Sequence, residues 1–186
     1  MLTATISFAA ALAVLSSLPA QDSTRWTGLL FGGQSVQLLG AEDSRFVSGA
    51  SLQYAMPHPQ VRFRNAPGEL ILEAYYHSSH SRGASQQPPN VSSSYGVLAS
   101  ARYSRPWGEG KQTFIEIGWG FQYANRRTVD LSGRLSSTPT FGAGCAFPWA
   151  GQEWVAVLRL THVSNAGFEG NNQGQNQLLG MVGFRF

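Results

Sequence analysis

The sequence has little charge, a single cysteine and only one long apolar run. Asp, Glu, Lys and Arg make up 12% of its 186 residues, about half the share usual for a soluble globular domain. Cys145 stands alone, which excludes an intrachain disulfide. The formal net charge is +3, and Lys and Arg never run beyond the pair Arg126–Arg127. This charge distribution does not support nucleic-acid binding, and no nucleic-acid partner is expected.

The one long apolar run occupies residues 1–20, "MLTATISFAAALAVLSSLPA", which carry no charged side chain. An apolar run that ends in small residues is typical of a secretory signal peptide, with cleavage expected after Ala20. It departs from the usual pattern because no Lys or Arg precedes the apolar core. A single membrane anchor is the alternative, but the run is short and is broken by Ser16, Ser17 and Pro19. Residues 21–186 are then the mature domain.

Beyond residue 25 the apolar residues recur with period two. In "FIEIGWGFQY", residues 114–123, every odd position is apolar, whereas the even positions mix Phe114, Glu116, two glycines and Gln122. The same alternation runs through 70–77, 95–104 and 141–149. Period two predicts strands with two unlike faces and excludes amphipathic helices in these segments.

Two details favour a membrane barrel over a soluble sandwich or a lipocalin-like binder. Ionisable residues fall in mid-strand on the less apolar face, as in a polar lumen: Glu73, Arg102, Glu116 and Arg159. Aromatic residues stand at the ends of the apolar faces, as in interfacial girdles: Tyr95, Tyr103, Tyr123, Trp149 and Trp154. The segments are about ten residues long, the length that crosses a bilayer when tilted.

The pattern therefore predicts an all-β fold, an eight-stranded antiparallel transmembrane β-barrel. The barrel must close because an open sheet edge would leave backbone groups unpaired in lipid. Long connections rich in Ser, Asn, Gly and Arg mark the extracellular side: 78–93, 124–137 and 165–176. Short connections are expected at 105–112 and 149–152, and the link at 57–68 is longer than this alternation predicts. The expected strands lie near 26–35, 45–56, 69–78, 94–104, 113–123, 138–148, 153–164 and 177–186.

Two polar residues continue the outward row of the strand near 153–164. Arg159 marks the odd positions as lumen-facing, so His162 and Ser164 should face outward. Asn176 shares its parity with the outward positions of the last strand, which ends on Phe186. The three side chains should thus gather on one outer face at the long-loop end, where a Ser–His pair could reach lipid ester bonds in the outer leaflet. Alternatively, they are ordinary polar residues at the lipid–water interface.

The segment "THVSNAG", followed by "NNQGQN", resembles the lipid A 3-O-deacylase (PagL) family of Gram-negative outer membranes, also called the acyloxyacyl hydrolase family. The family's pattern is His-x-Ser-Asn-Ala-Gly, then Asn-x-Gly-x-Glu. The first part is matched by His162, Ser164, Asn165, Ala166 and Gly167, and the second by Asn172 and Gly174 with the same spacing. The expected barrel size, the signal and the aromatic last residue agree with the family along the whole chain.

The resemblance implies a serine esterase that removes an ester-linked acyl chain, the 3-hydroxyacyl chain at the 3-position, from lipid A of lipopolysaccharide. Ser164 would be the nucleophile and His162 the general base and acid, with no metal or cofactor. Oxyanion donors would be Asn172 and the Gly167 N–H, with Asn165 as an extra donor or a structural loop residue.

Asn176 stands where the family has its catalytic Glu. Its amide oxygen could still orient His162, whereas Glu169 in the loop is the alternative partner. A weak or inactive homologue, a non-catalytic anchoring barrel and a homodimer stay open.

Two further clusters have simpler interpretations. His77 and His80 in "HSSH" lie three apart, which is too few ligands for a metal. Glu73 and Glu116 could form a catalytic acid pair, but a lumen network with Arg102, Arg159 or Arg185 is favoured.

Overall fold

The structure is a computed structural model that describes residues 25–36, 43–63, 66–81, 90–165, 170 and 172–186. Its elements are all strands. The signal peptide predicted for residues 1–20 lies outside the described residues. No helix long and apolar enough to span a membrane occurs within the described ranges. The strands are β1 (Arg25–Val36), β2 (Arg45–Phe63), β3 (Ala66–Ser81), β4 (Val91–Gly108), β5 (Lys111–Ala124), β6 (Leu135–Ser137), β7 (Thr140–Trp149), β8 (Gln152–Val163) and β9 (Gln175–Arg185).

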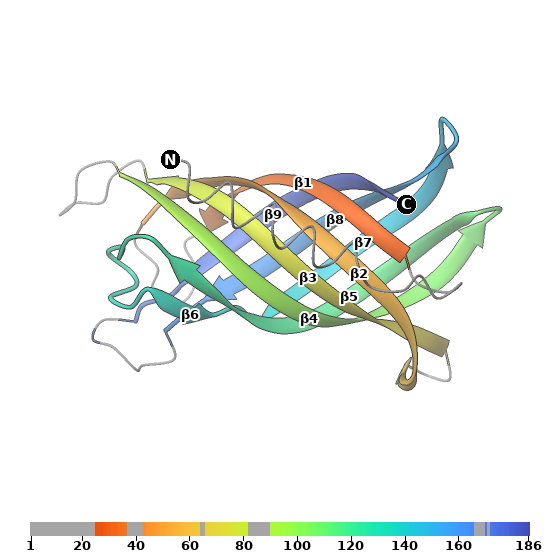
Figure 1. Ribbon diagram of the computed structural model, residues 1–186, viewed down its shortest axis with the longest axis horizontal. Coiled ribbons are helices and arrows are strands. Elements are labelled where there is room, and N and C mark those ends of the chain that lie inside the picture. The colour runs from red at the N-terminus through yellow and green to blue at the C-terminus, as the bar shows by residue number, and fades with distance from the viewer. Residues whose placement is uncertain (1–24, 37–42, 64–65, 82–89, 166–169, 171) are drawn as a thin grey trace.

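The strands close into an antiparallel barrel, which confirms the predicted fold. Neighbours follow the order β4-β3-β2-β1-β9-β8-β7-β5-β6, and an additional pairing of β4 with β5 joins the two ends of the sheet. The first and last strands therefore meet, with Thr27 opposite Arg185 and Val36 opposite Asn176. Figure 1 shows the strands running obliquely around a common axis.

β6 and β7 are two parts of one barrel strand. Ser137 of β6 lies opposite Phe121 of β5, and Thr140 of β7 lies opposite Gly118. The register is the same across the break, so the barrel wall has eight strands. Pro139 falls in the break, and a proline has no N–H to donate to the ladder. The strand predicted for 138–148 thus begins earlier, at Leu135.

The links predicted at 57–68 and 105–112 are too long, because most of these residues belong to the strands of two long hairpins. β2 continues to Phe63 and β3 starts at Ala66, with a register shift between His58 and Arg62. β4 and β5 pair as far as Gly108 and Lys111. These hairpin turns gather at the end of the barrel where the chain terminates, and β6 lies toward the other end (Figure 1).

The two faces of the wall match the predicted alternation. On the outside, Val97, Ile117 and Leu158 keep 61%, 60% and 58% of their surface exposed. Glu116 and Arg159, which are adjacent along the chain to Ile117 and Leu158, are buried inside. A soluble barrel would turn its apolar side chains inward, and an exposed apolar surface of this extent indicates a lipid-facing wall.

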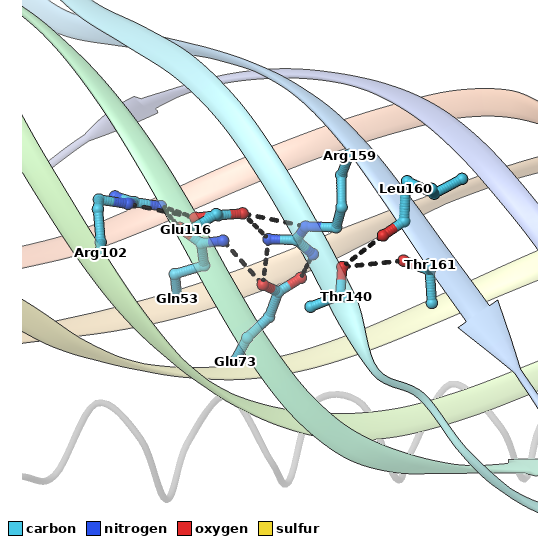
Figure 2. A network of polar contacts seen from close by, with 8 residues as sticks. All are labelled: Gln53, Glu73, Arg102, Glu116, Thr140, Arg159, Leu160 and Thr161. Carbon is cyan, nitrogen blue, oxygen red and sulfur yellow. Dashed lines mark hydrogen bonds and ion pairs between the residues drawn. The ribbon is translucent and has the colours of Figure 1, made fainter.

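Four charged side chains form ion pairs inside the barrel, as the favoured interpretation of Glu73 and Glu116 predicts. Arg159 donates to both Glu73 oxygens at 2.9 and 2.8 Å and to Glu116 at 2.7 Å. Arg102 donates to Glu116 at 2.8 Å, and Gln53 links Arg102 to Glu73. Figure 2 shows this network crossing the lumen.

Arg185 takes no part in this network and pairs with Glu153 at 3.2 Å instead. Around the network the interior is filled by apolar side chains, among them Leu29, Phe31, Phe114 and Met181. Two guanidinium groups offset two carboxylates, so the network is neutral. Removing one member would leave a buried, unpaired charge.

We expect Arg159→Met to lower the free energy of unfolding by about 3–5 kcal/mol, because it removes the arginine that pairs with Glu73 and leaves that buried carboxylate with the neutral Gln53 amide, while Glu116 keeps its pair with Arg102. Urea unfolding in detergent or lipid bilayers measures the loss. Arg105→Met is the matched control, since Arg105 is exposed near the β4–β5 turn. Equal unfolding midpoints for the two variants would show that the network contributes little.

Candidate functional site

The β8–β9 ladder sets His162 and Asn176 directly opposite one another. The His162 ring nitrogen Nδ1 is 2.8 Å from the Asn176 side-chain oxygen Oδ1. Both residues continue the outward rows of their strands, beyond Leu160 and Leu178, as the sequence predicts. His162 is half-buried, whereas Asn176 keeps only 3% of its surface exposed.

This contact defines the tautomer of the His162 ring. A carbonyl oxygen can only accept, so Nδ1 carries the proton and donates it to Oδ1. The other nitrogen, Nε2, then keeps its lone pair. A neutral imidazole that is oriented in this way can accept a proton from a nearby hydroxyl group.

Ser164 occupies the next outward position beyond His162 and forms a bridge with Ser137 of β6. Two backbone hydrogen bonds of 2.7 and 3.1 Å hold the two serines together. The Ser164 hydroxyl oxygen lies 3.3 Å from the Ser137 hydroxyl oxygen. Among the described residues no hydrogen bond joins Ser164 to His162. The predicted shared outer face is therefore present, without a hydrogen bond between its serine and its histidine.

Asn172 and Asn165 are connected to one another beside Ser164. The Asn165 backbone N–H donates to the Asn172 Oδ1 at 2.9 Å, and the Asn165 side-chain amide donates to the Ser132 hydroxyl at 3.3 Å. Asn165 is 2% exposed, so its side chain serves the loop rather than a ligand. With its oxygen engaged, the part of Asn172 that can donate to a ligand is its amide nitrogen. The other predicted site residues, Gly167 and Glu169, lie outside the described residues.

The connection between β5 and β6 braces this end of β9, a role that the sequence did not indicate. Leu131 bridges to Asn172, the Gly174 N–H donates to the Asp130 carbonyl at 3.3 Å, and Gln175 donates to the Thr128 hydroxyl at 3.0 Å. This segment has no period-two pattern, so its position beside the last strand could not be predicted from the sequence alone.

Gly174 packs beneath the His162 ring. Its φ of +75° is a conformation that side-chain-bearing residues rarely adopt. A Cβ atom added there would lie 2.7 Å from Cε1 and 3.2 Å from Nε2 of His162. The glycine therefore allows the backbone to approach the imidazole closely enough to support it from one side.

A second Ser–His pair lies on the outer face of β3. The Ser78 hydroxyl is 3.4 Å from Nε2 of His80, and both side chains point outward. His77 points inward and is buried, so His77 and His80 face opposite sides of the wall and cannot share a metal ion. The same parity rule that placed Ser164 beside His162 would have found this pair.

The two Ser–His pairs differ in what surrounds the histidine. His162 has an amide oxygen on Nδ1 and Gly174 against its ring. For His80, no hydrogen bond to Nδ1 is found within the part of the chain that the structure describes. The histidine of the pair on β8 is therefore the better oriented base, although its serine is hydrogen-bonded to Ser137.

Comparisons with known proteins show the family and the fold of the chain. A sequence model described as lipid A 3-O-deacylase (PagL) matches residues 48–185. The crystal structure of the outer membrane enzyme PagL superposes with a TM-score of 0.67 at 19% identity, covering 87% of this chain and 98% of that one. Neisserial surface protein A (NspA) superposes with a TM-score of 0.51 at 15% identity, covering 87% and 94%. At these identities the two superpositions show the fold alone. No curated protein matches the sequence.

Gly174→Ala should displace the His162 imidazole, because the new methyl group would overlap Cε1. We expect the ring ¹⁵N shifts of His162 to lose the pattern of a single tautomer. Gly151→Ala is the matched control, since Gly151 has a similar φ of +77° but no atom within 4 Å of an added Cβ. Unchanged His162 signals in Gly174→Ala would mean that the ring does not depend on this support.

Proposed function

Because the chain belongs to the lipid A 3-O-deacylase (PagL) family, we propose that it is an outer-membrane serine esterase. Its substrate would be lipid A of lipopolysaccharide, and the bond cut would be the ester of the 3-hydroxyacyl chain at the 3-position. The barrel would lie in a Gram-negative outer membrane with the His162 end toward the outer leaflet. The family match over residues 48–185 and the lipid-facing wall support this placement.

One observation carries the proposal: the Nδ1–Oδ1 contact of 2.8 Å between His162 and Asn176. It prepares Nε2 as a base on the lipid-facing side of the wall, one outward position from the Ser164 hydroxyl. A pair in the lumen would meet soluble molecules, whereas a pair on the outer face meets lipid. The chemistry that suits this position is hydrolysis of an ester within a lipid.

In the first half of the reaction, the Ser164 hydroxyl oxygen attacks the ester carbonyl carbon, and His162 Nε2 takes the hydroxyl proton. Negative charge develops on the former carbonyl oxygen. The Asn172 amide N–H, together with the Gly167 backbone N–H, would donate to this oxyanion. The intermediate collapses as His162 returns the proton to the sugar oxygen, which leaves as a free hydroxyl.

In the second half, a water molecule attacks the acyl group now bound to Ser164, with His162 again taking a proton. Cleavage of the acyl–Ser164 bond releases the fatty acid and restores the serine hydroxyl. Asn176 does not change its protonation in either half. Its contribution is orientation, since an amide can hold the ring but cannot balance the positive charge of an imidazolium.

The wall next to the site suits an acyl chain. Below His162 and Asn176 the outward residues are Leu160 and Leu178. They are followed by a shallow groove on β8 and β9, lined outside by Ala156, Leu158, Gly180 and Val182. Gly180 and Ala156 keep the groove open. A lipid with its ester at the rim could lay its chain along this surface.

Ser164→Ala and His162→Asn should each reduce deacylation at least about a thousand-fold, because they remove the nucleophile and the base. Mass spectrometry of lipid A from cells making each variant measures the loss and identifies which acyl chain is removed. Ser78→Ala and His80→Asn form the matched control, with the same substitutions in the other outward Ser–His pair, and should leave the lipid A pattern of the parent.

Three outcomes of these experiments would distinguish the possible functions and sites. If neither pair matters and lipid A is unaltered even by the parent protein, the barrel is a non-catalytic membrane protein. If the β3 substitutions abolish deacylation and the β8 substitutions do not, the active site has been assigned to the wrong pair. Removal of a chain other than the 3-position one would correct the specificity alone.

Asn176→Glu should raise the deacylation rate by roughly fivefold, the factor that corresponds to about 1 kcal/mol. A hydrogen bond to a charged acceptor contributes about 1 kcal/mol more than one to a neutral acceptor, and the imidazolium gains that difference as it forms. Asn176→Asp, whose side chain is smaller than that of glutamate, should also raise the rate. Asn176→Leu should reduce it. Initial rates on purified lipopolysaccharide in mixed micelles measure these changes. Complete loss of activity in Asn176→Glu would show that His162 is oriented by another group.

A further inference from the structure

Ser137 lies within hydrogen-bond distance of the Ser164 hydroxyl, and neither the motif nor the family pattern includes it. It faces outward at the end of β6, opposite Ser164, and the two residues exchange both backbone hydrogen bonds. Its hydroxyl oxygen is 3.2 Å from the Ser164 carbonyl oxygen and 3.3 Å from the Ser164 hydroxyl oxygen. The Ser137 hydroxyl thus contacts two atoms of the nucleophilic residue at once.

Counting protons gives the direction of these two hydrogen bonds. A carbonyl oxygen can only accept, so the single Ser137 hydroxyl proton is directed to the Ser164 carbonyl. Either oxygen can be the donor in the contact between the two hydroxyl groups, and with the Ser137 proton on the carbonyl this contact uses the Ser164 proton. That proton is the one that His162 Nε2 has to take. With this arrangement the proton is bonded to Ser137 and not to the base.

We propose that Ser137 is a positioning residue that holds the Ser164 hydroxyl in a resting orientation turned away from His162. The inference rests on the proposed function, since it concerns the nucleophile of that reaction. Activation is then a rotation of the Ser164 side chain, in which its proton leaves the Ser137 oxygen and turns to Nε2. Ser137 keeps its own bond to the Ser164 carbonyl throughout, so the fold is not disturbed.

The resting orientation suits a site that opens directly onto a membrane. Ester-bearing lipids surround the wall, and a serine already bonded to its base could react with any that approach. Holding the proton on Ser137 imposes a cost of about one neutral hydrogen bond on every reaction. A lipid that occupies the groove and reaches Asn172 offsets this cost through its own contacts, whereas a poorly fitting lipid does not.

The test uses a small fluorophosphonate on the purified full-length barrel in detergent. The Ser164 oxygen forms a bond to phosphorus, fluoride leaves, and His162 takes the hydroxyl proton. Ser137→Ala should react about fivefold faster than the parent, the factor that corresponds to about 1 kcal/mol. Ser137→Thr, which keeps the hydroxyl, should react at the parent rate. Ser48→Ala removes an outward hydroxyl on β2 and should also leave the rate unchanged.

A faster or a slower reaction of Ser137→Ala distinguishes a positioning role of Ser137 from damage to the site. A poorly folded or poorly packed site would react more slowly, so only release of a held hydroxyl produces a faster reaction that threonine reverses. If Ser164 is labelled but Ser137→Ala reacts at the parent rate or below it, the resting contact is refuted and the serine mechanism stands. If Ser164 is labelled in neither protein, the serine mechanism fails, and the inference about Ser137 fails with it.

Discussion

The site depends on the requirement that every backbone N–H and C=O inside the bilayer be paired within the protein. This requirement brings β1 to β9, although the two strands lie at opposite ends of the described chain. The same ladder fixes β9 against β8 and so sets Asn176 across from His162, which is 14 residues earlier in the sequence. A slip of one residue would turn either side chain to the other face and separate them.

In the closed barrel the charged and the uncharged polar groups of the wall also lie on different faces. The ionised side chains of mid-strand point inward, where Arg102 and Arg159 neutralise Glu73 and Glu116. The polar groups on the outward rim of β6, β8 and β9 are two hydroxyl groups, an amide and an imidazole. A full charge on the lipid side would lose its water with no opposite charge beside it, and this costs far more than an uncharged hydrogen-bonding group.

Much of this arrangement could be predicted from the sequence, because the two-residue period is local. Parity alone gave the outward positions of His162 and Asn176 and the inward positions of Glu116 and Arg159. Parity alone did not distinguish the pair on β8 from Ser78 and His80, and there the motif was decisive. The contact of Ser164 with Ser137 was beyond reach, since β6 follows a connection without periodicity and the contact also depends on side-chain rotation. The length of the β2–β3 hairpin was missed, since the expected link at 57–68 begins with Pro57 and ends with Gly68, and both residues pair in the ladder.

The amide at position 176 follows from the same division of charge. Asn176 is almost wholly covered, between His162 on β8 and Val36 on β1. A carboxylate in that place would be a buried charge, and the neutral form of His162 would not balance it. An amide costs much less to bury and holds the ring in the same tautomer at every step. Asn176 would therefore stabilise the imidazolium less than a carboxylate would, but it leaves the resting site without net charge.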